Sequence, residues 1–307
     1  MTMNHHDHDH AHVDDKYLAV VNASQVTTDD AVVAAEVKKI LDEHFDENNN
    51  KEVWEYLLNT VELTTLDTAD SERSVAAFTK TVNDYWRRYP DYKNVASICV
   101  YSNFAAVVRA NLEVSDVNVV VCSASFPASQ AHLETKIAET ALAIADGADE
   151  VDIVLNVGYF KDEAYEELCD EIAEIKHSCK EHNLKVILET GLLKTAEAIR
   201  RASILAMYAG ADFIKTSTGK IYPGASLEAA YVMCQCIKEY HQKHGTMIGF
   251  KPAGGIRSTE DAVKYYTIVK EVLGEEWVKD NRYFRIGASS LANNLFQSFS
   301  GKEEKPF

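Results

Sequence analysis

Two lysines and one aspartate stand in apolar segments, where a charged side chain is costly unless it is paired or hydrated. Lys215 lies in the run DFIKT, Lys251 ends the run TMIGFK, and Asp152 lies within DEVDIVL. If each run is a strand, alternation places Asp152 on the face opposite to Val151 and Ile153. We therefore expect these three charged groups to point into a sheet or barrel, away from the covering helices.

Two neighbouring ammonium groups change each other's chemistry. At a separation of about 4 Å and an effective dielectric of about 20 they repel by about 4 kcal/mol. This energy corresponds to about 3 pKa units, enough to leave one lysine neutral and nucleophilic near pH 7. A single lysine at a strand end would instead be interpreted as a side chain that reaches out to water. Two such lysines beside a carboxylate predict Schiff-base chemistry.

Small residues follow each of the last three strand-like runs. These turns are Ser-Thr-Gly-Lys at 217–220, Pro-Ala-Gly-Gly at 252–255 and Gly-Ala-Ser-Ser at 287–290. Glycine lets backbone N–H groups approach a ligand closely, and the turns after the last two strands of a (β/α)8 barrel commonly bind phosphate. One such turn alone would be ordinary strand-to-helix chemistry. Three in succession, next to two lysines, predict a phosphorylated substrate.

Strand-like runs alternate with helix-like segments from about residue 53 onward. The eight runs are 60–66, 95–101, 117–122, 149–155, 185–190, 212–216, 246–251 and 283–287. Strict alternation predicts a parallel sheet, and the span 53–300 is close to the ~250 residues typical of a (β/α)8 TIM barrel. A doubly wound open sheet is the alternative α/β fold. The absence of GxGxxG after the first run argues against a dinucleotide-binding version of it.

The two ends of the chain differ in composition from this repeating region. We expect a disordered His/Asp-rich tail over 1–28, a helical extension over 29–52, a TIM-barrel domain over 53–300 and a flexible tail over 301–307. The helical extension rests on an apolar stripe in DDAVVAAEVKKILDEHF. Five histidines in the first tail offer transition-metal ligands, although a solvated tail is the simpler interpretation. They are His5, His6, His8, His10 and His12.

Composition narrows the function classes. The chain of 307 residues has 48 acidic and 31 basic side chains, a formal charge of −17, which disfavours nucleic acid and anionic membranes as partners. No apolar run reaches the ~18 residues of a membrane-spanning helix, and the N-terminus lacks the apolar segment of a secretory signal. The six cysteines form no CxxC motif and are predicted to be reduced thiols. A cytoplasmic enzyme is the expectation.

The main motif segments are DFIKTSTGK (212–220), GFKPAGGIR (249–257) and RIGASS (285–290), with support from ADEVDIV (148–154), ILETG (187–191) and LTTL (63–66). In these segments the chain resembles the class I, metal-free deoxyribose-phosphate aldolases, with a layout like their longer bacterial branch. The resemblance covers roughly residues 53–300. It implies a TIM barrel that reversibly cleaves 2-deoxy-D-ribose 5-phosphate to acetaldehyde and D-glyceraldehyde 3-phosphate, without a metal or organic cofactor. The resemblance is compatible with a homodimer but does not fix the oligomeric state.

The resemblance also implies roles for individual residues. Lys215 matches the Schiff-base lysine, Lys251 the second lysine that lowers its pKa, and Asp152 the carboxylate of the proton relay. Cys99 matches a cysteine near the pocket in some members, and Glu62 stands where the longer branch often has Asp. The positions matching substrate- or phosphate-binding turns are Thr218, Gly219, Lys220, Gly254, Gly255, Gly287, Ser289 and Ser290.

Other interpretations stay open at this point. The chain could be a Schiff-base aldolase for another phosphosugar, or a barrel that binds a phosphosugar without reacting; the intact lysine pair argues against the second. The His-rich tail could be a metal-binding module. Family members often end in a tyrosine that reaches the site, whereas this chain ends in Phe307, which has no hydroxyl group for proton transfer.

Overall fold

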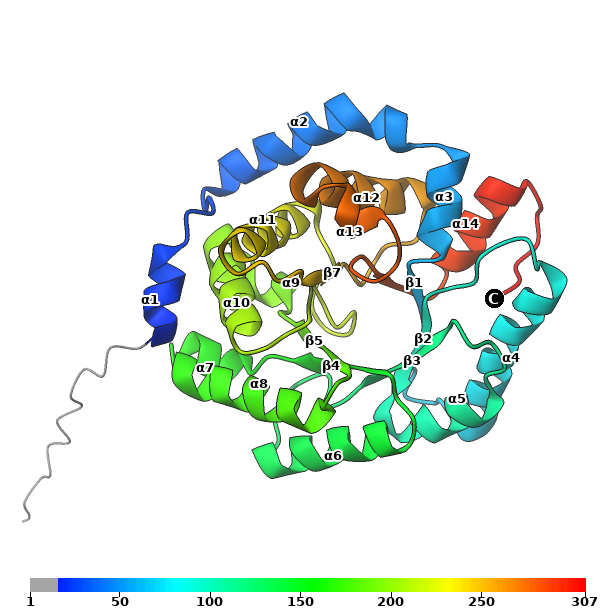
Figure 1. The fold of residues 1–307 in the computed structure, drawn as a ribbon, viewed down its shortest axis with the longest axis horizontal. Coiled ribbons are helices and arrows are strands. Elements are labelled where there is room, and N and C mark those ends of the chain that lie inside the picture. The colour runs from blue at the N-terminus through cyan, green and yellow to red at the C-terminus, as the bar shows by residue number, and fades with distance from the viewer. Residues whose placement is uncertain (1–15) are drawn as a thin grey trace, which may run out of the picture.

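Eight parallel strands form the centre of the molecule in a computed structural model that describes residues 16–307. Strands β1 (Val61–Thr64) to β7 (Gly249–Lys251) pair in sequence order, and β1 also pairs with β8 (Ile286–Ala288). Bridges at Phe250–Phe284 and Ala253–Gly287 bring β7 beside β8, so the sheet is a nearly closed barrel (Figure 1). The predicted TIM barrel is confirmed. The strands are β1 (Val61–Thr64), β2 (Ser97–Tyr101), β3 (Asn118–Cys122), β4 (Glu150–Val154), β5 (Asn183–Ile187), β6 (Phe213–Lys215), β7 (Gly249–Lys251) and β8 (Ile286–Ala288).

Helices surround the barrel and cover the outer face of its strands. Because the strands are buried on both faces, their sequences are nearly continuous apolar runs. Ser258 and Asp261 form a capping box that opens α12 (Thr259–Leu273). Among residues 16–307, no helix combines the length and apolar character needed to cross a membrane. The surrounding helices are α4 (Glu72–Arg88), α5 (Ala105–Asn111), α6 (Leu133–Ala145), α7 (Val157–Lys161), α8 (Tyr165–Cys179), α9 (Thr190–Leu193), α10 (Ala196–Tyr208), α11 (Leu227–His244), α12 (Thr259–Leu273), α13 (Glu275–Val278) and α14 (Leu291–Ser300), with a short 3-10 turn, η1 (Ser102–Phe104), before α5.

The N-terminal region forms three helices, α1 (Lys16–Ala23), α2 (Asp30–Asn48) and α3 (Lys51–Leu58). Helix α2 arches over the outside of α11 and α12 (Figure 1). The prediction of disorder over 1–28 is wrong for α1, which packs on α10 and α8. Its Tyr17 and Val21 are buried, and the Arg200 guanidinium donates to the Val21 carbonyl at 2.7 Å. The five histidines of the tail lie outside the described residues.

The C-terminal segment 301–307 was expected to be flexible but packs on the outer wall of the barrel. The Phe307 ring stacks on Tyr85 of α4, with ring centroids 4.6 Å apart. The Asn293 side chain accepts from the Phe307 N–H at 3.0 Å and donates to its carbonyl at 2.8 Å. Stacking of the partly buried ring and two hydrogen bonds fix the chain end between α4 and the first turn of α14.

Candidate active site

Charged side chains fill the interior of the barrel in two layers. The upper layer, toward the carboxyl ends of the strands, consists of Asp152, Lys215 and Lys251. The lower layer consists of Glu150, Lys185 and Arg285, and Glu62 contacts residues of both layers. All seven side chains are buried. Charges so deep in a protein persist only when they are paired.

Asp152 lies between the two predicted lysines. Its Oδ2 accepts from Lys215 Nζ at 2.8 Å and from Lys251 Nζ at 2.7 Å, so the two nitrogens are within about 5.5 Å of each other. Its Oδ1 accepts from Lys185 Nζ at 3.1 Å. Burial alone would raise the pKa of Asp152, but the three lysines hold it well below its usual value. The inward orientation expected from strand alternation is therefore observed, and the three ammonium groups favour the ionised form of the carboxyl group.

Lys251 is the enclosed member of the lysine pair. It is fully buried and donates to the Glu62 carboxylate as well as to Asp152. Burial alone would lower its pKa, but Asp152 and Glu62 raise the pKa of Lys251 well above its usual value. From the sequence we expected two bare ammonium groups that repel each other. In the structure, carboxylates lie against both lysines and favour the protonated form of Lys251.

The lower layer was missed in the sequence. Glu150 Oε2 lies 2.7 Å from Lys185 Nζ, and its Oε1 lies 3.2 Å from Arg285 Nη2. A signal was present, because strand alternation puts Glu150 on the same face as Asp152. The register of β4 and β5 then pairs Asp152 with Lys185, which only the folded sheet reveals.

A cavity of about 530 Å³ opens at the carboxyl ends of the strands, where barrel enzymes keep their active sites. Of the three lysines in the described barrel interior, Lys215 alone lines it. All eight predicted turn residues line it too: Thr218, Gly219, Lys220, Gly254, Gly255, Gly287, Ser289 and Ser290. Five further polar or charged residues that line the cavity were not predicted as site residues: Thr64, Thr65, Asp67, Thr68 and Arg257. Four belong to or follow the LTTL segment and one ends the GFKPAGGIR segment, so the resemblance contained the signal.

Two of the turns require glycine. Gly254 has φ +85°, a conformation that side chains rarely adopt, and a Cβ there would lie 3.0 Å from Gly224 Cα. A Cβ on Gly287 would lie 2.9 Å from Ala253 Cβ and 3.1 Å from Lys251 Cε. Because neither residue has a side chain, the backbone groups of these two turns form part of the cavity wall. Ser290 directly precedes α14, whose N-terminal end carries a partial positive charge that suits an anion.

Comparison with known proteins agrees with this geometry. Residues 59–293 match the family described as "DeoC/LacD family aldolase". The chain belongs to this family. The chain is 45% identical to the human deoxyribose-phosphate aldolase over 202 residues, which is 65% of this chain and 63% of the human protein. It is 41% identical to a Caenorhabditis elegans protein named "Putative deoxyribose-phosphate aldolase", covering 81% of this chain and 82% of that protein.

Solved structures share the fold of this DeoC/LacD family aldolase. The tetrameric deoxyribose phosphate aldolase from Aeropyrum pernix superimposes with a TM-score of 0.64 at 23% identity. The match covers 87% of this chain and 97% of that one. At this sequence identity the similarity supports the barrel fold alone.

Two predicted pocket residues of the aldolase lie beneath the cavity and do not line it. Glu62 is fully buried, and its carboxylate forms ion pairs with Lys251, Lys185 and Arg285. Cys99 is buried against Cys122 on the neighbouring strand. Direct contact with a substrate in the cavity is therefore not expected of either side chain.

Proposed function

We propose that this aldolase reversibly cleaves 2-deoxy-D-ribose 5-phosphate to acetaldehyde and D-glyceraldehyde 3-phosphate, with Lys215 as the Schiff-base lysine. The observation that carries the proposal is that Lys215 alone of the interior lysines borders the cavity while its Nζ contacts Asp152 at 2.8 Å. Support for the substrate comes from the relatives, which are named deoxyribose-phosphate aldolases. The sequence resemblance pointed to the same reaction.

The first half of the reaction forms the covalent intermediate. Lys215 must lose a proton before it can attack, and Asp152 Oδ2 lies within hydrogen-bond distance to accept it. The neutral amine adds to the C1 aldehyde, and loss of water gives an iminium ion. Lys251, held protonated by its two carboxylates, is the acid available for that dehydration.

The second half breaks the C2–C3 bond. A base removes the proton of the C3 hydroxyl, a role we assign to Asp152 acting through water, and the bonding electrons flow into the iminium to give an enamine. D-Glyceraldehyde 3-phosphate leaves. Protonation of the enamine at C2 and hydrolysis by water then release acetaldehyde and regenerate Lys215. The proton that Asp152 takes from Lys215 passes to Lys251 after Lys251 has protonated the leaving water. The proton that Asp152 takes from the C3 hydroxyl is the one returned to C2 of the enamine, so the protons balance and neither a metal nor an organic cofactor is invoked.

The phosphate belongs, in this proposal, at the turns after β6, β7 and β8. Thr218, Gly219, Gly254, Gly255, Gly287, Ser289 and Ser290 supply backbone and hydroxyl groups, and Lys220 supplies positive charge. Arg257, which also lines the cavity, adds a second cation. A chain with a formal charge of −17 needs such a local concentration of cations to attract an anionic substrate.

We further propose that residues 53–300 are the aldolase domain, that the enzyme is cytoplasmic and that it forms homodimers. All six cysteines are free thiols, as expected in a reducing compartment. A small phosphosugar is the expected partner, and nucleic acid is not. Sedimentation of the purified chain would separate a homodimer from a monomer or a tetramer.

Borohydride trapping tests the assignment of Lys215. The protein is incubated with acetaldehyde and sodium borohydride, digested and mapped by mass spectrometry. We expect one ethyl group on Lys215 and none on Lys185 or Lys251, because only Lys215 is reached from the cavity. Modification of a different lysine, or none, would refute the assignment. Turnover of 2-deoxy-D-ribose 5-phosphate against other phosphosugars tests the substrate.

A further inference from the structure

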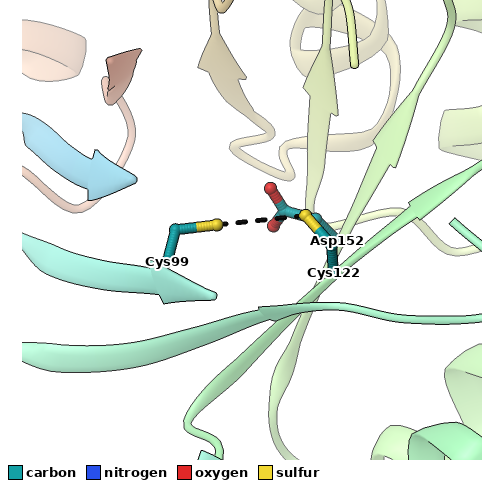
Figure 2. Close-up of side chains that lie close together, drawn as sticks. All are labelled: Cys99, Cys122 and Asp152. Carbon is teal, nitrogen blue, oxygen red and sulfur yellow. Dashed lines mark hydrogen bonds between the residues drawn. The ribbon is translucent and has the colours of Figure 1, made fainter. Parts of the chain in front are cut away.

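Two thiols and a carboxylate converge beneath the cavity. Cys99 on β2 and Cys122 on β3 have their sulfur atoms 3.9 Å apart. Both Sγ atoms and a carboxylate oxygen of Asp152 on β4 lie within 4.8 Å of one another, and all three side chains are buried. Figure 2 shows the three side chains approaching one point from separate strands. The mechanism above uses only the carboxylate.

We propose that Cys99, Cys122 and Asp152 form a binding site for a thiophilic divalent cation such as Zn²⁺, and that occupancy inhibits the aldolase. The inhibitory part rests on the proposed function, because the cation would take the carboxylate assigned to proton transfer. The binding part is independent of it.

The spacing of the sulfur atoms suits a metal ion. Two thiolates bound to zinc at about 2.3 Å with tetrahedral geometry lie about 3.8 Å apart, close to the 3.9 Å between Cys99 and Cys122. A disulfide fits less well. Cys99 is in register with Val120, so Cys122 is its diagonal neighbour. With neighbouring strands about 4.8 Å apart and a rise of about 3.3 Å per residue, an offset of two residues puts the two Cα atoms about 8 Å apart, beyond the usual Cα separation across a disulfide.

The charge balance of the barrel interior and the position of the site next to the cavity also permit a cation to bind. Zn²⁺ that displaces the two thiol protons leaves the net charge of the interior unchanged, because two thiolates balance the dication. Leu66 packs against the thiol pair and also lines the cavity, so the site lies directly under the cavity wall. Water from the cavity can complete a four-coordinate shell. Coordination would draw Asp152 away from Lys215 and Lys251, which now share its Oδ2.

Cobalt spectroscopy tests binding without any assay of activity. The full chain, kept reduced with a phosphine, is titrated with Co²⁺, and the thiolate-to-cobalt charge-transfer band is followed in the near ultraviolet. Histidine and carboxylate ligands give no such band, so the His-rich tail does not interfere. We expect a saturable band in the unaltered chain and in Cys179→Ser, a control at the end of α8, and its loss in Cys122→Ser. Cys99→Ser serves if Cys122→Ser does not fold.

Zinc inhibition tests the consequence. Rates are divided by each variant's own rate in EDTA, and we expect half-inhibition to need at least about tenfold more Zn²⁺ in Cys122→Ser than in Cys179→Ser. Absence of the band in the unaltered chain, or its persistence in both Cys99→Ser and Cys122→Ser, would overturn the site. A band without inhibition, or equal inhibition of all variants, would overturn the inhibitory role. If deoxyribose phosphate is not cleaved at all, the proposed function fails and the band still decides the binding site.

Discussion

The upper and lower layers of the barrel interior contain the same residue types in different surroundings. In the lower layer, Lys185 is fully buried and contacts the carboxylates of Glu150 and Asp152. In the upper layer, Lys215 contacts Asp152 alone among the carboxylates and borders the cavity. A lysine enclosed by carboxylates, as Lys185 and Lys251 are, cannot reach a substrate as a nucleophile. A lysine with one carboxylate and one open side can meet a substrate.

The pKa of Lys185 reflects its enclosure. Burial alone would lower the pKa, but Asp152, Glu150 and Glu62 hold it above its usual value. A permanently protonated amine cannot attack a carbonyl group. The lower layer is therefore predicted to be structural and the upper layer catalytic, and each prediction below tests that division.

The largest effect is expected from Lys215→Met. Methionine fills similar space without an amine, so deoxyribose phosphate cleavage should fall by at least about ten-thousand-fold, as when other enzymes lose their nucleophile. The borohydride adduct should disappear. Circular dichroism should show that the fold is retained, and the loss of stability should be smaller than in Lys185→Met, because Asp152 keeps Lys185 and Lys251 as partners. Retention of activity within a factor of about ten would transfer the nucleophile to another lysine and abolish the distinction between the layers.

Asp152→Asn should come next. The amide keeps the shape but cannot accept a proton, so turnover should drop by about a hundred- to ten-thousand-fold, the range of general acid–base catalysis. Borohydride trapping at high pH should still find an adduct on Lys215, because solvent can deprotonate the amine there. Near-normal turnover would show that the proton relay runs through other groups.

The fold could be predicted from the sequence because its strongest signals are local. The run VNVVVC becomes β3, buried along almost its whole length. Alternation in DEVDIVL correctly aims Asp152 inward. Both features depend only on neighbours along the chain, which is the information that a sequence pattern contains.

The missing parts depend on contacts between distant segments. Strand β5 begins at Asn183, two residues before the predicted run. The prediction began the strand too late because the polar residues at 181–183 are typical of a turn. Lys185 is therefore in mid-strand opposite Asp152, and its ion pairs come from other strands. Helix α1 is similar, since its two buried side chains are covered by helices far away in the sequence.

Lys185→Met tests the structural role of the lower layer. Removing one partner leaves the carboxylate of Glu150 buried with fewer cations, which should lower the free energy of unfolding by about 3–5 kcal/mol. Lys38→Met, which breaks an exposed pair with Asp42, should cost less than about 1 kcal/mol. The Lys185→Met adduct with acetaldehyde should still form on Lys215. A loss of adduct in a folded Lys185→Met protein would make the lower layer part of the catalytic apparatus.

Ser289→Asp tests the phosphate end of the upper layer's cavity. A carboxylate there would repel the substrate phosphate by about 2 kcal/mol, lowering kcat/KM for deoxyribose 5-phosphate by about thirtyfold. Unphosphorylated deoxyribose should lose much less. Ser289→Asn, which adds similar bulk without charge, is the matched control. Equal losses on both substrates would place the phosphate elsewhere.

The smallest expected effect is a change with pH in the free energy of unfolding. It tests the structural role of the lower layer without any measurement of activity. Burial would raise the pKa of Glu150, but Lys185 and Arg285 hold it below the usual value. A depressed carboxyl pKa contributes stability that is complete above the unfolded pKa of about 4 and is lost as pH falls through the folded value. In Lys185→Met, Glu150 should take up a proton at higher pH and so relieve its unpaired charge. The stability difference between the unaltered chain and Lys185→Met should therefore narrow by about 1 kcal/mol between pH 7 and pH 4, as chemical denaturation can measure. A difference that is constant with pH would show that lost packing, rather than a lost ion pair, destabilises the variant.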